Sequence, residues 1–472
     1  MQGKVISNSG ELSHWKRAVC VKRKISLAEV FFATGILLLP YDAFPIMPST
    51  YRPISLVPFF ISLLFIISDD GIRQIKLIGR RQLLILGFFA LTFCGNAFRV
   101  LAGNIQPDNY IDTIVTLVIG LLAYFCFTSY LRWRATQESF ATTLDRLLHL
   151  LSVAYILPLF VGCLEAASLN GLLPSSVNVA LISFFGGNQS YRLTLTSFEA
   201  SWASIHLIIA ALCNLFLYRK DKSAFHFVCF CVATVLFFLT NSMQGVMVLG
   251  CATAAFILWY GYKKKRLLVI FRWMLIVVGV FVTFLFVLRL YFESSGAETY
   301  FATRLVNFTD LTRLIHIDGS SFVRLIFPLI GLQMFMMHPV FGTGAGTFAQ
   351  QLPKYISEYY PWSVQFEEIS RYLNGTLTPS AVCLYTRALG ELGLLGSALF
   401  FAFVCSSFRC IGNVASRGGL QGLHVVYLIF VLICTPLQFA SYAYLPFWLA
   451  LALLDFAGYK EITNKNIKEM FI

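Results

Sequence analysis

Gly319-Ser-Ser-Phe-Val-Arg324 opens a stretch that continues through an apolar run, Leu325–Met337, to His338-Pro-Val-Phe-Gly-Thr-Gly-Ala-Gly-Thr347. This stretch lies inside the longest polar interruption of the chain, Tyr291–Ser380, and long apolar segments flank that interruption on both sides. A second, shorter polar interruption, Leu169–Phe198, contains Arg192. We expect the chemistry of the protein to reside in the longer interruption, with the shorter one as its partner.

The composition places the chain in a membrane. Of its 472 residues 58% are apolar and 12% are charged, and the mean hydropathy is +0.73, whereas soluble domains carry about 25% charged residues. Apolar runs near 20 residues predict membrane-spanning helices. The sequence therefore predicts an all-α polytopic membrane protein with about twelve transmembrane helices, at residues 26–47, 52–68, 82–98, 110–131, 147–168, 200–218, 224–241, 244–261, 267–290, 382–407, 421–438 and 441–458.

The distribution of basic residues predicts the orientation of these helices. With the N-terminus in the cytoplasm, every segment that would be cytoplasmic is rich in Lys and Arg, as the positive-inside rule requires. Both termini are then cytoplasmic, and the long polar interruption lies outside. The net charge of +13 needs no nucleic acid to explain it, since no recognition motif accompanies the charge. Four parts are expected: helices 1–5 at 1–190, helices 6–9 with the Arg192 loop at 191–292, the large outer loop at 293–381, and helices 10–12 at 382–472.

The basic residues left on the outer face are almost all arginines. Arg binds phosphate and carboxylate through a planar fork, whereas Lys acts as a point charge. The bias predicts an anionic ligand on the outer side, and the alternative is a set of ordinary surface or interface arginines. The residues concerned are Arg52, Arg99, Arg192, Arg289, Arg304, Arg313, Arg324, Lys354, Arg371 and Arg387.

Two of these arginines stand out by their surroundings. Arg192 and Glu199 lie just ahead of a predicted span that begins near Ala200. Glu199 can cap that helix at its positive N-terminal end, or it can act as a general base or orient Arg192. Arg324 heads the apolar run Leu325–Met337, where a guanidinium either snorkels to the membrane surface or pairs with an anion.

The run Leu325–Met337 has 13 residues and contains Pro328. It is therefore predicted to be an interfacial or buried helix, the alternative being a thirteenth span. The following Gly342-Thr-Gly-Ala-Gly346 lacks the Lys-Ser/Thr of a P-loop and follows an apolar helix. It predicts a turn, or a backbone nest able to hold an anion. His338 is expected to be a structural residue of this turn, and the alternative is a catalytic histidine.

Acidic and aromatic residues follow this loop in one patch. Such a patch suits the stacking of sugar rings, and it equally suits a helix lying on the bilayer surface, where Trp and Tyr collect. No metal-binding spacing is present, so neither a metal nor a cofactor is expected in the chemistry. The members of the patch are Tyr355, Glu358, Tyr359, Tyr360, Trp362, Glu367, Glu368 and Tyr372.

Four stretches resemble, in order and spacing, the superfamily of O-antigen polymerases (Wzy) and O-antigen ligases. Arg192–Ala200 is similar to an arginine followed after five or six residues by Glu-Pro or Asn-Pro, and Leu239-Thr-Asn-Ser242 is similar to its Leu-Thr-x-Ser-Arg. The third stretch runs from Phe322 to Phe348 and resembles Arg…Pro-Leu-Phe-Gly-x-Gly-x-Gly-x-Phe. The fourth, Leu389-Gly-Glu-Leu-Gly-Leu-Leu-Gly396, resembles Glu-x-Gly-Ile-x-Gly. The resemblance covers roughly residues 190–410.

The resemblance implies a GT-C-like fold in the bacterial inner membrane and a glycosyltransferase that uses undecaprenyl-diphosphate-linked oligosaccharide repeat units on the periplasmic side. It implies that Arg192 and Arg324 grip the diphosphate, with Glu199 as a further catalytic candidate. It also implies contact with membrane lipid and a chain-length regulator as a partner. Further candidates for substrate contact are Tyr191, Arg304, Arg313, His338, Arg371, Tyr372 and Arg387.

The chain departs from the superfamily pattern at two positions. Met243 replaces the arginine of Leu-Thr-x-Ser-Arg, and Val382 stands where the ligases carry a histidine, nine residues before the Glu of Glu-x-Gly. The missing histidine favours a polymerase over a ligase and leaves the base unassigned. A ligase-type transferase, a lipid-linked oligosaccharide flippase or other transporter, and a non-enzymatic assembly partner remain the alternative interpretations.

Overall fold

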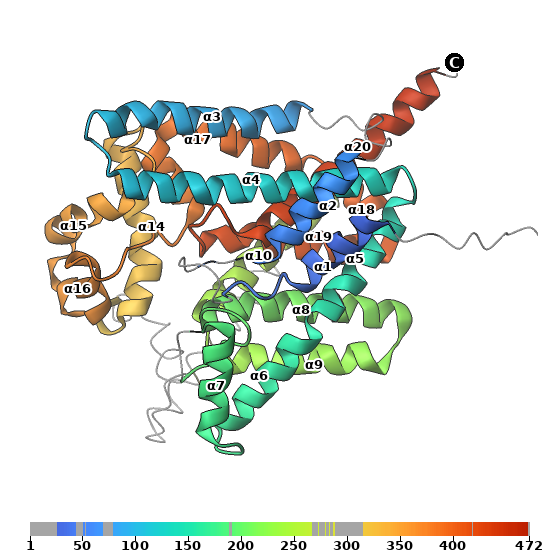
Figure 1. Ribbon diagram of the computed structural model, residues 1–472, viewed down its shortest axis with the longest axis horizontal. Coiled ribbons are helices and arrows are strands. Elements are labelled where there is room, and N and C mark those ends of the chain that lie inside the picture. The colour runs from blue at the N-terminus through green and yellow to red at the C-terminus, as the bar shows by residue number, and fades with distance from the viewer. Residues whose placement is uncertain are drawn as a thin grey trace, which may run out of the picture.

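The computed structural model describes residues 26–43, 51, 53–68, 79–187, 191–266, 315–417 and 419–470, with isolated positions at 272, 279, 283 and 287. Every regular element in these ranges is helical (Figure 1). The elements are α1 (Leu27–Leu37), α2 (Leu56–Ser68), α3 (Arg80–Leu101), α4 (Pro107–Ala135), α5 (Phe140–Ala154), α6 (Ile156–Leu169), α7 (Ser175–Phe185), α8 (Ala200–Asp221), α9 (Ala224–Leu239), α10 (Met243–Lys263), α14 (Gly319–Met337), α15 (Phe348–Tyr359), η3 (Pro361–Gln365), α16 (Glu367–Leu373), α17 (Leu384–Phe408), α18 (Ile411–Arg417), α19 (Gly419–Cys434), η4 (Thr435–Leu437) and α20 (Leu445–Met470).

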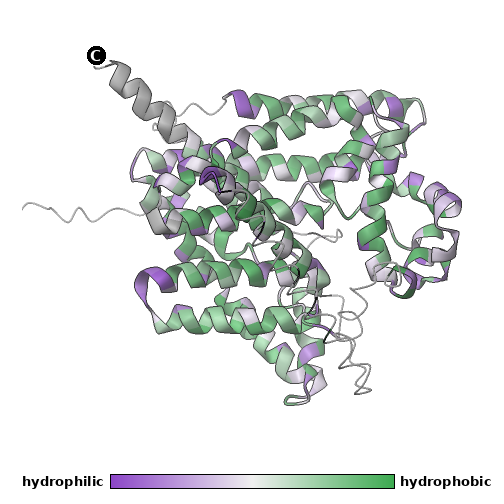
Figure 2. Ribbon diagram, turned by 180° about the vertical axis from the view of Figure 1, so that it is seen from behind, coloured by the Kyte–Doolittle hydropathy of each residue, from purple (hydrophilic) through white to green (hydrophobic). Residues whose placement is uncertain are grey.

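The helices have the length and composition of a polytopic membrane protein. Each predicted span that falls on described residues overlaps a helix, though the bounds differ: span 26–47 contains α1 of only 11 residues, and span 147–168 corresponds to α5 and α6 together. Figure 2 shows hydrophobic residues along the helices and hydrophilic ones at turns such as α8–α9. The prediction of an all-α membrane protein is confirmed at this level. The count of twelve stays a prediction, because span 267–290 lies outside the described residues apart from isolated positions. Helices long and apolar enough to cross a membrane are found at Arg80–Leu101, Pro107–Ala135, Phe140–Leu169, Ala200–Asp221, Met243–Lys263, Gly319–Met337 and Leu384–Arg417.

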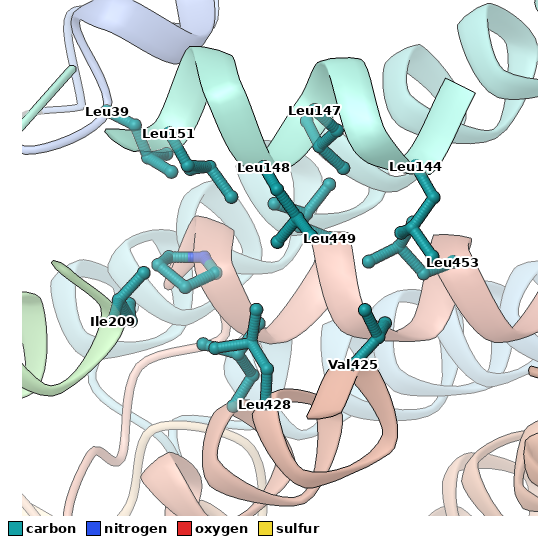
Figure 3. Close-up of a pocket in the computed structure, with 12 residues that line it drawn as sticks. Leu39, Leu144, Leu147, Leu148, Leu151, Ile209, Val425, Leu428, Leu449 and Leu453 are labelled. Carbon is teal, nitrogen blue, oxygen red and sulfur yellow. The ribbon is translucent and has the colours of Figure 1, made fainter. Parts of the chain in front are cut away.

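The interior is built by aromatic and aliphatic side chains from most of the helices. Trp448 of α20 is fully buried, its ring lies 6.1 Å from that of Tyr124 on α4, and its Nε1–H donates to the carbonyl of Tyr442. Gly120 of α4 faces the same indole, and a Cβ there would overlap it, so only glycine permits this approach. A pocket between α5, α8, α19 and α20 is lined by leucine, isoleucine, valine and proline side chains (Figure 3). Its lining offers no polar group, so it is not a place for a charged ligand.

Buried ion pairs hold one end of the helices together. Asp455 of α20 accepts from Arg132 of α4 at 2.5 Å and from Arg81 of α3 at 3.3 Å. Arg134, also on α4, is fully buried and pairs with Glu29 of α1 and with Glu138. Removing one partner from such a pair leaves a buried charge uncompensated, which costs about 3–5 kcal/mol.

Helices α14, α15 and α16 form a second apolar core at the opposite end (Figure 1). Asp318 caps α14, since its carboxylate accepts from the backbone N–H of Ser321. The helix begins six residues before the apolar run identified in the sequence, and its 19 residues give it the length of a span. In Figures 1 and 2 α14 runs at a steep angle to α3 and α4, at the same end of the molecule as α15 and α16.

Candidate functional site

The glycine-rich loop after α14 is docked into a break in α17. Gly393 interrupts α17 with φ 63° and ψ −169°, a conformation that glycine adopts readily. The backbone groups freed by this break bond to the loop: Thr343 N–H donates to Gly390 O at 3.0 Å, and Leu394 N–H donates to Pro339 O at 2.7 Å. Two of the stretches that carry the family resemblance, Phe322–Phe348 and Leu389–Gly396, therefore interlock.

Glu391 completes this junction from the middle of the break. Its side chain is 1% exposed, and its two carboxylate oxygens accept from the N–H groups of Gly346 at 3.0 Å and Phe348 at 3.2 Å. The sequence predicted that the glycine loop is a turn or an anion-holding nest. In the structure the anion that it holds is a carboxylate of the protein itself.

Arg387, a predicted substrate-binding residue, serves the same junction. Its Nε donates to Glu391 at 3.1 Å, its Nη1 to the carbonyl of Ala440 at 2.9 Å, and its Nη2 to Thr113 Oγ1 at 2.8 Å. Each guanidinium nitrogen thus has a partner within the chain. Arg387 anchors α17 to α4 and to the segment before α20. This structural role explains its presence among the outer arginines without a ligand.

Arg192, the first predicted grip on the diphosphate, is 7% exposed and faces the turn between α9 and α10. Its Nη2 donates to the carbonyls of Thr240 at 3.0 Å and Asn241 at 2.8 Å, and its Nε also reaches Thr240 O. The guanidinium fork closes the C-terminal end of α9, whose last carbonyls lack helical partners. Arg192 therefore ties the 191–199 loop to the resembling stretch Leu239–Ser242.

The same loop delivers Glu199 to the start of α8. Glu199 is the N-cap residue, as one sequence interpretation expected, but its side chain makes no capping hydrogen bond. The carboxylate instead accepts from the hydroxyl of Ser201. Ser204, one turn further along α8, lies 3.1 Å from Ser242 Oγ in the α9–α10 turn that Arg192 holds. Glu199 is thus partly exposed and set on a framework that Arg192 helps to fix.

Tyr372 of α16 brings Glu199 and Arg324 into one electrostatic site. Burial raises the pKa of Tyr372, the carboxylates of Glu368 and Glu199 raise it further, and the Arg324 guanidinium opposes them. The hydroxyl is therefore protonated at neutral pH and donates to Glu368 at 2.9 Å. Arg324 is half-buried on α14, where it contacts the hydroxyl and carbonyl of Ser320. The guanidinium of Arg324, from the large loop, and the carboxylate of Glu199, at the end of the short loop, thus both act electrostatically on Tyr372.

The remaining predicted residues are exposed or lie outside the described ranges. Tyr191 is 70% exposed, and His338 and Arg371 are also exposed. Arg304 and Arg313 lie outside the described residues, so the structure does not place them. Within the aromatic patch, Tyr355 is buried in the second core, and Tyr360, Trp362 and Tyr372 pack against it. Most of its rings thus build the loop's own core, as aromatic side chains commonly do.

Two buried polar groups, Glu165 and His206, were not predicted from the sequence as site residues, and Glu165 holds the Arg192 loop. Glu165 of α6 accepts from the N–H groups of Thr194 at 3.0 Å and Leu195 at 2.8 Å, and Leu195 has φ 53°. His206 of α8 lies 2.9 Å from Asp42 Oδ2 and, through its other ring nitrogen, 2.9 Å from the hydroxyl of Tyr155. No sequence spacing signals these partners, because they come from different helices.

The arrangement can stabilise developing negative charge with Arg324 and accept a proton at Glu199. Among the residues that the structure describes, one group of side chains has metal-ligand geometry, His149, Asp221 and His226. It belongs to α5 and the α8–α9 turn rather than to this site. Comparison of the sequence with family models and with curated proteins gives no match.

Proposed function

We propose that this chain is an inner-membrane polysaccharide polymerase of the O-antigen type. It would transfer a growing glycan from undecaprenyl diphosphate to a new lipid-linked repeat unit on the periplasmic side. The observation that carries the proposal is that Glu199 and Arg324, which come from the two loops that the resemblance pairs, both act electrostatically on Tyr372. The interlocked glycine loop and α17 support it, since they fix α14 and with it Arg324.

In the proposed reaction the terminal hydroxyl oxygen of the acceptor attacks the anomeric carbon of the donor glycan. A new carbon–oxygen bond forms, and the bond from that carbon to the diphosphate breaks, with its electron pair leaving on the diphosphate oxygen. The anomeric configuration is inverted. Arg324 holds the departing diphosphate through charge-assisted hydrogen bonds. Glu199 accepts the proton of the attacking hydroxyl.

Arg192 takes a different part in this proposal from the direct grip that the sequence predicted. Its Nε and Nη2 donate to backbone carbonyls of the α9–α10 turn. We assign it to positioning the loop that ends at Glu199. Polyprenyl tails would lie along the apolar helices, and a chain-length regulator remains a proposed partner.

The test is turnover by the purified protein in detergent, with lipid-linked repeat units as both donor and acceptor and with chain length read on gels. Arg324→Ala should slow chain extension about 10²–10³-fold, since it removes a charged contact made to the leaving group. Arg324→Lys should recover little of the rate, because a point charge does not replace the fork. Lys354→Ala, an exposed cation on α15, is the matched control and should leave the ladder unchanged.

Three results would contradict the proposal. Wild-type ladders from Arg324→Ala would remove Arg324 from the site. If the folded wild-type protein shows no turnover but moves lipid-linked repeat units across vesicle membranes, it is a transporter instead. Transfer of the glycan to added lipid A-core would identify a ligase, because a polymerase should not use that acceptor.

A further inference from the structure

Three side chains from three helices meet at the end of the molecule away from α14–α16. His149 lies on α5, Asp221 is the last residue of α8, and His226 lies in the first turn of α9. One ligand atom from each falls within 4.8 Å of the other two. The group is independent of the polymerase proposal, since none of its members takes part in the chemistry around Tyr372.

The hydrogen bonds of both histidines leave the same ring nitrogen available. His149 Nδ1 lies 2.9 Å from the backbone carbonyl of Asp145, which can only accept, so Nδ1 carries the proton. His226 Nδ1 lies 3.0 Å from Asn214 Oδ1, also an acceptor. In a neutral imidazole Nε2 then holds the lone pair. This is the arrangement of metal-ligating histidines, whose other N–H is held by a carbonyl or carboxylate.

A cation between His149 and Asp221 would satisfy both side chains. His149 Nε2 lies 3.5 Å from Asp221 Oδ2, which is too long for a direct N–H···O hydrogen bond. With Nδ1 protonated, a lone pair on Nε2 faces an anionic oxygen. A metal ion placed between the two atoms would satisfy both.

The charges around the group also admit a divalent ion. Asp145 and Asp221 are the acidic neighbours, and Lys220 Nζ lies 2.5 Å from Asp145 Oδ1 and 3.9 Å from Asp221 Oδ1. Lys220 is therefore closer to Asp145 than to Asp221. The other carboxylate oxygen of Asp221, Oδ2, is directed toward His149. Asp221 is exposed and His149 is half-buried, so both side chains can move inward by the ångström or so that coordination at about 2.0–2.2 Å requires.

We propose that His149, Asp221 and His226 bind one transition-metal ion of the Zn²⁺ class. Two imidazoles and one carboxylate are a ligand set that Zn²⁺ accepts with a fourth position left to water. The bound ion would clamp the α8–α9 turn onto α5. The opposite ends of α8 and α9 carry Glu199 and the turn held by Arg192, so the clamp acts on the helices that support the proposed catalytic loop.

The experiment uses the full-length protein purified in detergent through a tag without histidine, stripped with chelator and dialysed. Zn²⁺ is then titrated against a competing fluorescent indicator, and Co²⁺ is added separately to read the ligand field in its visible spectrum. We expect one saturable site per chain and an increase in unfolding temperature when Zn²⁺ is bound.

Single variants decide whether these three residues are the ligands. His149→Ala and Asp221→Ala change partly exposed side chains, and each should weaken Zn²⁺ binding by at least about 100-fold, since even loss of an outer-shell partner costs about 10–100-fold. His424→Ala is the matched control. His424 lies on α19, its Nε2 contacts Arg219 in the last turn of α8, and it should bind no metal. Unchanged stoichiometric binding in both ligand variants would overturn the proposal. The absence of saturable Zn²⁺ binding by the wild-type protein would also overturn it.

Discussion

At the scale of single residues, Glu391 is the side chain on which the candidate site depends most for its shape. Its carboxylate accepts from two backbone N–H groups of the glycine loop and from Arg387. In Glu391→Gln one oxygen becomes an NH₂ group that faces another donor, and Arg387 loses its counter-charge. We expect a loss of about 3–5 kcal/mol in the free energy of unfolding, measured as thermal loss of the monodisperse peak in detergent.

The control for this prediction is Glu358→Gln, an exposed carboxylate on α15, which should change stability by less than about 0.5 kcal/mol. Combining Glu391→Gln with Arg387→Met should recover part of the loss, because the second change removes the buried unpaired charge. Equal stability of Glu391→Gln and wild type would mean that the loop is held by its backbone bonds alone.

The sequence singled out the outer arginines, but it did not predict what they bind within the chain. Arg99, Arg192 and Arg387 all donate to backbone carbonyls. A carbonyl partner leaves no trace in the sequence, because every residue has one. Arg324 has no acidic partner among the described ion pairs, and it keeps the ligand-binding interpretation that its place ahead of an apolar run suggested.

At the scale of elements, helix positions followed from hydropathy, whereas the docking of the glycine loop into α17 did not. A hydrophobic run of 20 residues reports burial in a membrane but not a break at Gly393 or the segment that fills it. The break is possible within an apolar helix because the loop satisfies the freed backbone groups. The run Leu325–Met337 was predicted as a helix, and α14 extends six residues further toward the N-terminus, to Gly319.

Two glycines allow the effect of close packing on stability to be told apart from the effect of a positive φ. Gly342 and Gly375 both have positive φ, at 65° and 75°. A Cβ on Gly342 would overlap the backbone of Glu391, whereas nothing lies within 4 Å of a Cβ on Gly375. Gly375→Ala should cost about 1 kcal/mol, the penalty of a left-handed alanine. Gly342→Ala should cost several times more and reduce activity, measured by thermal stability and by chain extension. Equal effects would contradict the docked loop.

At the scale of the whole molecule, the two ends differ in chemistry. Buried pairs between Arg81, Arg132 and Asp455 and between Arg134, Glu29 and Glu138 lie at the end that the sequence assigns to the cytoplasm. The Tyr372 site lies at the other end, with α14–α16. The sequence predicted the polarity of the bundle from Lys and Arg counts. It could not predict which acids pair with those residues, because Asp455 is more than 300 residues from both of its arginines.

Whether α14 crosses the membrane decides on which side each half of the large loop lies. The C-terminal part of α14 meets α17 near its start, where Gly331 packs against Thr386 and the loop after α14 reaches Gly390. The helix therefore does not follow α17 through to Phe408, and we predict that it stays on the outer side. Reporter fusions after residues 317 and 375 should both show periplasmic phosphatase activity, and fusions after 222 and 417 should show none. Opposite results at 317 and 375 would make α14 a thirteenth span, place the C-terminal basic segment outside, and put Tyr372 on the other side of the membrane from Glu199.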